Sequence, residues 1–149
     1  MTRMNWSRLI LGGLIAGVII DVFEYVTNGV ILADEWAGAM KAVGKPETLS
    51  SLQMVAFNIW GLAMGVLALW LYAAIRPRFG AGPKTAICAG AAVWALGYLM
   101  GSAGDFITHV LPRRLLAISI AVGLVEIIVA TLAGAYFYRE SQWGNTSAH

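Results

Sequence analysis

The sequence is poor in charge, in cysteine and in clusters of basic residues. Only 12% of its 149 residues are charged, about half the fraction typical of soluble domains. The formal net charge is +2 and Lys and Arg never form a long run, which excludes a basic nucleic-acid-binding surface. The single cysteine, Cys88, cannot form an intrachain disulfide, which excludes a small domain held together by disulfides.

The motifs of several common enzyme classes are also missing. The chain contains no G-x-x-x-x-G-K-[ST], H-E-x-x-H, C-x-x-C or G-x-S-x-G. Ser119 has no histidine near it that could act as a base, and Cys88 lies in an apolar segment with no base nearby. The sequence therefore gives no support for nucleotide hydrolysis or nucleophilic catalysis.

What the sequence has instead is four long apolar runs. Hydrophobic residues make up 59% of the chain and concentrate in residues 9–32, 51–75, 85–111 and 115–138. Each run reaches the ~20 residues that cross ~30 Å of hydrocarbon as a helix, and none alternates as a strand would. The first run is too long for a signal peptide and carries two acids, so we expect it to be retained. We predict one all-α domain over residues 1–149, an integral membrane four-helix bundle.

Turn and cap residues separate the four runs. A Pro/Gly-rich turn over residues 76–84 follows the second run, and Pro112 separates the last two. Ser50 and Gln53 predict a capping box at the start of the second helix. Residues 34–43 repeat apolar side chains at helical spacing, which fits a short helix in the headgroup region. A solvated loop fits this segment equally well.

Lys and Arg are unevenly divided between the two ends of the predicted bundle. The side of the termini holds Arg3, Arg8, Arg76, Arg78, Lys84 and Arg139, and the other side holds Lys41, Lys45, Arg113 and Arg114. Aromatic residues, among them Trp6, Trp70 and Trp143, gather at the first boundary as an interfacial belt does. We therefore expect both termini in the cytoplasm.

Small residues follow one side of each predicted helix at three- and four-residue steps. The clearest pairs are Gly13/Gly17, Gly61/Gly65 and Gly97/Gly101. Small residues let membrane helices approach closely, so this side should face a neighbouring helix. Polar residues continue the same stripes and should therefore also point into the bundle.

Five of these polar residues form the predicted site: Asp21, Glu24, Asn58, Asp105 and Glu126. Asp21 and Glu126 lie ~16 Å below the outer ends of their helices, and the other three lie ~9–12 Å below. A charged acid at the bilayer centre costs at least ~2.5–3.5 kcal/mol and by default marks a functional site. We predict one interior cluster that shares protons through hydrogen bonds, with Asn58 as its hydrogen-bonding partner.

Three functions fit such a cluster. The first is structural: hydrogen bonds of ~0.6 kcal/mol each would hold the helices of an accessory or assembly subunit. The second is transport of a proton-linked solute or cation by an oligomer, since a carboxylate can exchange a proton for a cation. The expected partners are the lipid bilayer and either a second copy or another membrane protein.

The third function is that of a metal-dependent membrane enzyme. His109, Asp105 and Glu24 are the candidate ligands, because nitrogen and oxygen donors from several helices hold metals in helical bundles. The paired Glu-x-x-His motifs of such bundles are missing. The sequence therefore commits to no metal and no cofactor, and it favours a protein that is not an enzyme.

The overall layout resembles small four-span bacterial membrane protein families with no assigned function. The resemblance covers most of the chain and depends on Trp36 after the first span, on the Ile75-Arg76-Pro77-Arg78-Phe79-Gly80 turn, and on the Gly123-Leu124-Val125-Glu126 run. It implies a bacterial inner-membrane protein, and no activity or site residue comes with it.

Overall fold

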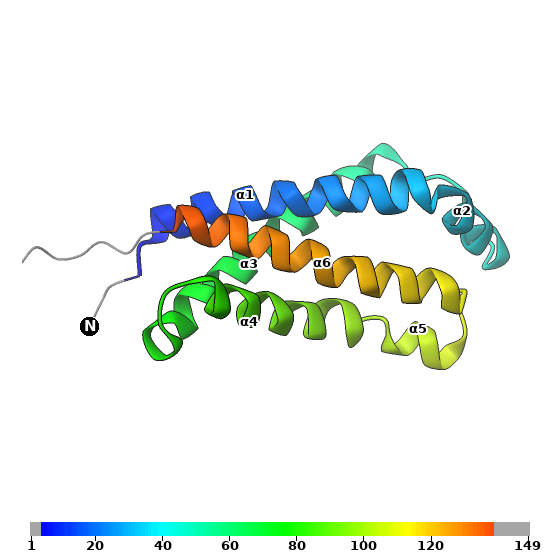
Figure 1. The fold of residues 1–149 in the computed structure, drawn as a ribbon. Helices are drawn as coiled ribbons and strands as arrows, with labels where there is room; N and C mark the ends of the chain where they lie inside the picture. The colour runs from blue at the N-terminus through cyan, green and yellow to red at the C-terminus, as the bar shows by residue number, and fades with distance from the viewer. Residues whose placement is uncertain (1–3, 139–149) are drawn as a thin grey trace, which may run out of the picture.

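The computed structural model describes residues 4–138, and within that range its regular elements are all helices (Figure 1). They are α1 (Trp6–Glu24), η1 (Tyr25–Ile31), α2 (Ala33–Ala42), α3 (Ser51–Phe79), α4 (Pro83–Trp94), η2 (Ala95–Leu99), α5 (Ala103–Thr108) and α6 (Arg113–Phe137). Four stretches are long and apolar enough to cross a membrane: Trp6–Ile31, Ser51–Phe79, Pro83–Thr108 and Arg113–Phe137. The prediction of an all-α four-helix bundle is confirmed.

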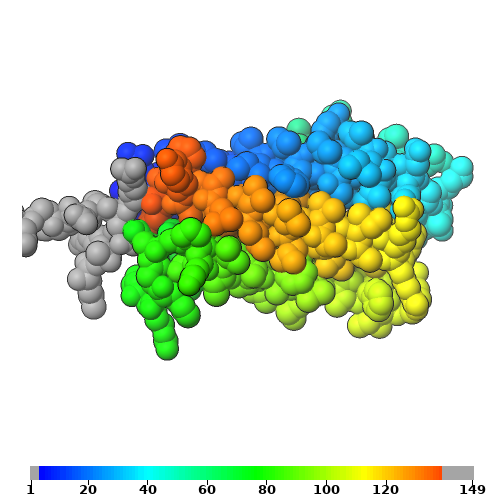
Figure 2. All heavy atoms as spheres, in the orientation of Figure 1, coloured from blue at the N-terminus to red at the C-terminus, as the bar shows by residue number. Residues whose placement is uncertain are grey.

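The four spans run back and forth along one axis. The start of α1, the turn between α3 and α4, and the end of α6 lie at one end of the bundle, while α2 and α5 lie at the other (Figure 1). We call these the terminal end and the far end. The space-filling view shows α6 lying between α1 and α4, and α6 contacts both helices (Figure 2). Arg3, Arg139 and Trp143, which entered the prediction of orientation, lie outside the described residues.

Glycines bring α1 close to α3 and to α6. A Cβ atom added to Gly65 would collide with the backbone of Gly13 and Gly17, and one added to Gly17 would lie near Leu62 Cα. This confirms close packing of the predicted stripes between α1 and α3. Gly12 and Gly134 make a second close approach, between α1 and α6, where each added Cβ would meet the other residue's carbonyl oxygen. Backbones this close leave no room for a larger residue.

Gly97 is less tightly enclosed than its predicted stripe suggests. The nearest atom to an added Cβ is Met64 Cε at 2.8 Å, which is the end of a flexible side chain. Gly97 lies in η2, where the third span leaves regular α geometry. The span then turns at residues 100–102 before α5 begins. A Gly-rich break within the third span is therefore present, but it redirects the helix instead of packing two helices together.

The predicted capping box is present, but the predicted turn over residues 76–84 is shorter, because α3 continues through Pro77 to Phe79 and α4 begins at Pro83. Ser50 Oγ accepts from the Gln53 amide and Gln53 Oε1 accepts from the Ser50 amide, so the predicted capping box is confirmed. The segment over residues 34–43 is helical as α2, and its Ala39 is buried with Leu32 against Leu115. These contacts attach α2 to the far end of α6.

We expect Gly17→Leu to destabilise the bundle. A side chain at this position would push Leu62 of α3 away, and overpacking of a tight contact typically costs ~1–3 kcal/mol. Val18→Leu is the matched control, because Val18 is exposed to the outside of the bundle. Thermal unfolding in mild detergent should show a lower midpoint for Gly17→Leu only. Equal midpoints for the two variants would mean that α1 and α3 do not pack through Gly17.

Candidate functional site

The site centres on the hydroxyl group of Tyr98, which lies between two carboxyl groups from different helices. Tyr98 Oη is 2.5 Å from Glu126 Oε1 of α6 and 3.3 Å from Glu24 Oε1 of α1. Glu126 is only 1% exposed, and Glu24 and Tyr98 are partly buried. Three of the four spans therefore meet at one phenol oxygen inside the bundle.

The number of hydrogens at this oxygen limits the protonation of the site. A tyrosine hydroxyl has one hydrogen to donate and can also accept. Tyr98 can therefore donate to only one of the two carboxyls at a time. The second contact is a hydrogen bond only if the other carboxyl carries a proton and donates it to the phenol oxygen. The geometry thus favours one shared proton in the pair Glu24 and Glu126.

Two more side chains extend the network toward α2. Asn28 Nδ2 donates to Glu24 Oε2, and Trp36 Nε1 donates to Asn28 Oδ1 at 2.9 Å. Ser119 Oγ lies 3.4 Å from the same Asn28 oxygen. With a proton on Glu24, the hydrogen bonds that lead from Trp36 through Asn28, Glu24 and Tyr98 to Glu126 all donate in the same direction. Hydrogen bonds aligned in this way polarise and strengthen one another.

Two π-helical turns supply the residues of this network. Asn28 lies in η1 and Tyr98 lies in η2, where backbone amides bond to the carbonyl five residues before, as from Met100 to Ala95. Such turns hold an extra residue, change which side chains point inward, and often occur at functional sites. In this chain they contain the amide and the phenol that contact Glu24.

Glycine makes room for the tyrosine ring. An added Cβ at Gly123 would lie 2.4–2.6 Å from ring carbons of Tyr98. Gly123 is three residues before Glu126 on α6, so the ring packs on the same face that presents the carboxyl group. A larger residue at this position would push the phenol away from Glu126.

Asp21 lies beside the network without a hydrogen bond into it. Its carboxyl interacts electrostatically with Glu24 and with Glu126. Its Oδ1 atom lies against Gly61 of α3, where an added Cβ would collide with it. Asp21 is partly exposed, unlike Glu126. Three of the five predicted residues, Asp21, Glu24 and Glu126, are therefore brought together.

Asn58 is not brought into the network. Its side chain is exposed and donates to the Met54 carbonyl of its own helix at 2.7 Å. The predicted hydrogen bond between Asn58 and the carboxyls is therefore wrong. The reason is that residues 51–60 of α3 are all exposed, so this part of the helix lies away from the bundle core.

Asp105 and His109 lie toward the far end. Asp105 is partly exposed on α5 and has no hydrogen bond or ion pair to another described residue. His109 caps α5 in the left-handed region at φ 56° and contacts Arg113. Among residues 4–138, no three His, Cys, Asp or Glu side chains form a group that could hold a metal ion. The ligand set considered for a metal enzyme is thus not assembled.

Tyr98 was missed because only carboxyl and amide side chains were considered for the site. Tyr98 lies four residues after Trp94 and three before Gly101, so even a regular α-helix places it at the edge of the predicted stripe. The π-turn of η2 shifts the register by one residue. The available signal was Gly123-x-x-Glu126 on α6, which leaves space for a ring beside a buried acid. Asn28 lay on the predicted stripe but was not included in the site.

Comparison of the chain with models of known families, with curated proteins and with solved structures finds no match. The function therefore has to be argued from the geometry of this site.

We expect Tyr98→Phe to leave the ring packed on Gly123 and to remove the shared hydroxyl. The buried Glu126 then loses its hydrogen-bonding partner, which typically costs ~1–3 kcal/mol. Tyr136→Phe is the control, because Tyr136 is 78% exposed. Thermal unfolding in detergent should show destabilisation for Tyr98→Phe and none for Tyr136→Phe. Similar stability of the two variants would contradict a shared hydrogen bond at Tyr98.

Proposed function

We propose that this chain is a proton-linked carrier of a small cation or solute, and that Glu24, Tyr98 and Glu126 hold the exchanged proton. The observation that carries the proposal is the placement of one phenol oxygen within hydrogen-bonding distance of two carboxyls. A group of this kind can hold a proton on either side. A purely structural hydrogen bond would need only one carboxyl.

The two protonation arrangements differ only in the position of hydrogens along the hydrogen bonds that join Glu24, Tyr98 and Glu126. With the proton on Glu24, Glu24 donates to Tyr98, and Tyr98 donates to Glu126. With the proton on Glu126, both donations reverse, and Glu24 is left ionised with Asn28 still donating to it. No atom is gained or lost in the shift: Glu24 gives up one hydrogen, the tyrosine oxygen receives one and gives one up, and Glu126 receives one. The tyrosine hydroxyl can thus move the proton between the buried and the partly exposed acid.

Asp21 is the proposed point of exchange with the surroundings. It is partly exposed and interacts electrostatically with both glutamates. A cation that approaches Asp21 and Glu24 would favour their ionised forms, and the proton would then leave. This is the exchange of a proton for a cation that a carboxylate-based carrier needs. We propose that the carrier works as an oligomer, because four spans are few for an alternating path.

An accessory subunit is the second candidate, and the far part of α3 supports it. All ten residues from Ser51 to Trp60 are exposed, including Phe57 at 61% and Trp60 at 68%. Asn58 lies among them with its amide oxygen unused by the described residues. Polar amides in membrane helices commonly pair across helices. A second copy or another membrane protein would find an unpaired helix surface here.

The central test is Glu126→Gln in proteoliposomes. Glutamine has nearly the same shape and can still accept from Tyr98, but it cannot release a proton. Vesicles loaded in turn with sodium or potassium salts are diluted into salt-free buffer, and a trapped pH-sensitive dye reports proton movement. We expect cation-driven proton movement with the unaltered chain and its loss in Glu126→Gln, with an unchanged thermal midpoint.

Asp34→Asn is the matched control, because it removes one exposed acid of α2 outside the network. It should leave proton movement unchanged. If the unaltered chain moves no protons with any of these cations, and Glu126→Gln changes only stability, the carrier is rejected in favour of the accessory subunit.

We also propose that the chain lies in a bacterial inner membrane with both termini in the cytoplasm, as the Lys and Arg distribution favours. The test uses a chain with Cys88→Ala and one added cysteine. A membrane-impermeant thiol reagent should modify Lys45→Cys in intact cells and spare Gly80→Cys. The reverse pattern would contradict the orientation.

A further inference from the structure

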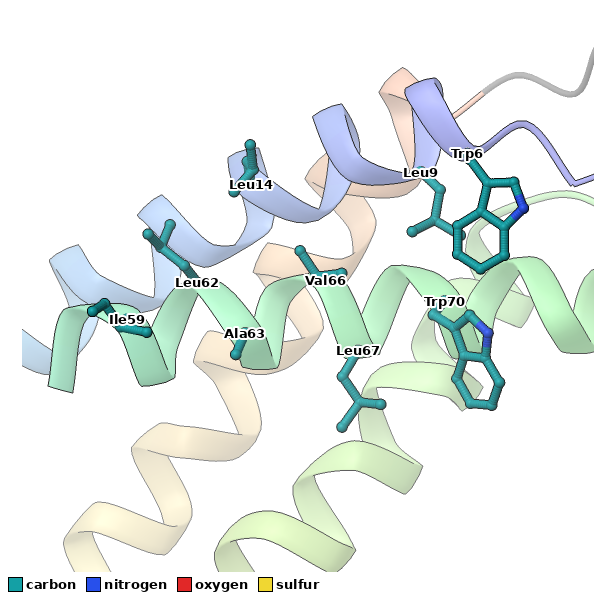
Figure 3. A pocket seen from close by; sticks show the side chains of 9 residues that line it. All are labelled: Trp6, Leu9, Leu14, Ile59, Leu62, Ala63, Val66, Leu67 and Trp70. Carbon is teal, nitrogen blue, oxygen red and sulfur yellow. The ribbon is translucent and has the colours of Figure 1, made fainter. Parts of the chain in front are cut away.

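An apolar groove lies on the side of the bundle where α1 packs on α3. It has a volume of about 550 Å³, and Trp6 and Trp70 lie close together at one end of it (Figure 3). The residues that line it, all of them described, carry no titratable side chain. The groove therefore offers no group that could pass a proton to Glu24, Tyr98 and Glu126. The polar groups that continue the network lie instead at the far end, on η1 and α2.

Trp36 is the first donor of the network and belongs to α2. The N-cap residue Leu32, Trp36 and Ala39 are spaced by four and three residues, so they lie on one side of this helix. Leu32 and Ala39 are buried against Leu115 of α6, and the Trp36 ring packs on the same cluster. The indole N–H is thereby held where it donates to Asn28 Oδ1, at 2.9 Å.

The N–H of Trp36 fixes which way the amide group of Asn28 faces. An indole nitrogen donates and cannot accept, so it lies against the amide oxygen and not against the amide nitrogen. The Nδ2 atom is therefore turned toward Glu24, where it donates to Oε2. Ser119 Oγ lies 3.4 Å from the same amide oxygen, but a hydroxyl can accept as well as donate and would permit either orientation. Of these two partners, Trp36 is the one that sets the orientation.

This orientation decides which oxygen of Glu24 can carry a proton. A proton on Oε2 would face the Nδ2 hydrogens of Asn28 and find no acceptor there. A proton on Oε1 faces Tyr98 Oη, which can accept it at 3.3 Å. If the amide turned over, Oε2 could instead donate to Asn28 Oδ1, and the proton would be held away from the phenol. The link between Glu24 and Glu126 through Tyr98 would then be lost.

We infer that Trp36 is a positioning residue for the shared proton: by holding the amide of Asn28, it confines the proton of Glu24 to the oxygen that faces Tyr98. The same orientation serves the ionised form of Glu24, which accepts from Asn28 in both arrangements. A short helix at the far end therefore sets where a proton lies inside the bundle. The inference rests on the proton sharing of the proposed function, but it does not require transport, so stability can test it separately.

The test measures how much stability Tyr98→Phe removes in different backgrounds of the full chain, by denaturant titration in mild detergent. Trp36→Phe keeps an aromatic ring in the cluster and removes the N–H group. In this background Tyr98→Phe should cost about a third less than in the unaltered chain, because the bond between Glu24 and the phenol is already weakened. Trp36→Met has a different shape and also lacks the N–H, so it should give the same reduction if the Phe variant does not fold.

Two further backgrounds separate the N–H group from the packing of α2. In Asn28→Leu, an added Trp36→Phe should leave the cost of Tyr98→Phe unchanged, because Trp36 acts through the amide. Glu35→Gln is the matched control: Glu35 is next to Trp36 and pairs with Arg114 of α6, so its loss weakens the attachment of α2 and leaves the N–H in place. In that background Tyr98→Phe should cost as much as in the unaltered chain.

An unreduced cost of Tyr98→Phe in the Trp36 variants would overturn the inference. An equal reduction in Glu35→Gln would overturn it as well, since the attachment of α2 would then be responsible. The carrier is judged independently: if the reduction is found and the unaltered chain moves no protons in vesicles, the carrier fails and the role of Trp36 stands. If protons move and no reduction is found, the role of Trp36 fails and the carrier stands.

Discussion

The hydrogen bond between Tyr98 and Glu126 is the interaction on which the interior of this bundle depends. A carboxyl group that is 1% exposed in a membrane span has no water to bind, so its partner must come from the protein. Tyr98 supplies that partner and also reaches Glu24, so three spans are joined at one point. The hydrogen bonds that hold the helices together are therefore the same ones that the proposed carrier would use to hold a proton.

Glycine packing makes this arrangement possible. Gly17 and Gly65 bring α1 and α3 into backbone contact, and Gly12 with Gly134 does the same for α1 and α6. With the terminal half of the bundle fixed in this way, the far half can deviate from regular geometry. The π-turns, the break before α5 and the exposed part of α3 all lie there. The tightly packed half gives rigidity, and the looser half carries the polar groups.

Length, composition and small-residue spacing were enough to predict four spans, the capping box and the close approach of α1 and α3. They also grouped Asp21, Glu24 and Glu126, because helical periodicity holds over most of α1 and α6. Asn58 was assigned wrongly, since periodicity cannot tell where a helix leaves the bundle. Tyr98 was missed for a different reason: the predicted site was limited to carboxyl and amide side chains, and the space that Gly123 leaves for an aromatic ring beside Glu126 was not considered.

The π-turn of η2 also has a consequence for insertions and deletions in this chain. Each residue of an α-helix adds a rotation of about 100° around the axis. A regular span that loses one residue is therefore turned by that angle beyond the deletion. The π-turn holds one extra residue, so loss of one residue between Ala95 and Leu99 would restore the regular helix and leave the residues after it facing the same way. The extra residue of η2 is therefore needed to place the phenol of Tyr98, and the span itself could do without it.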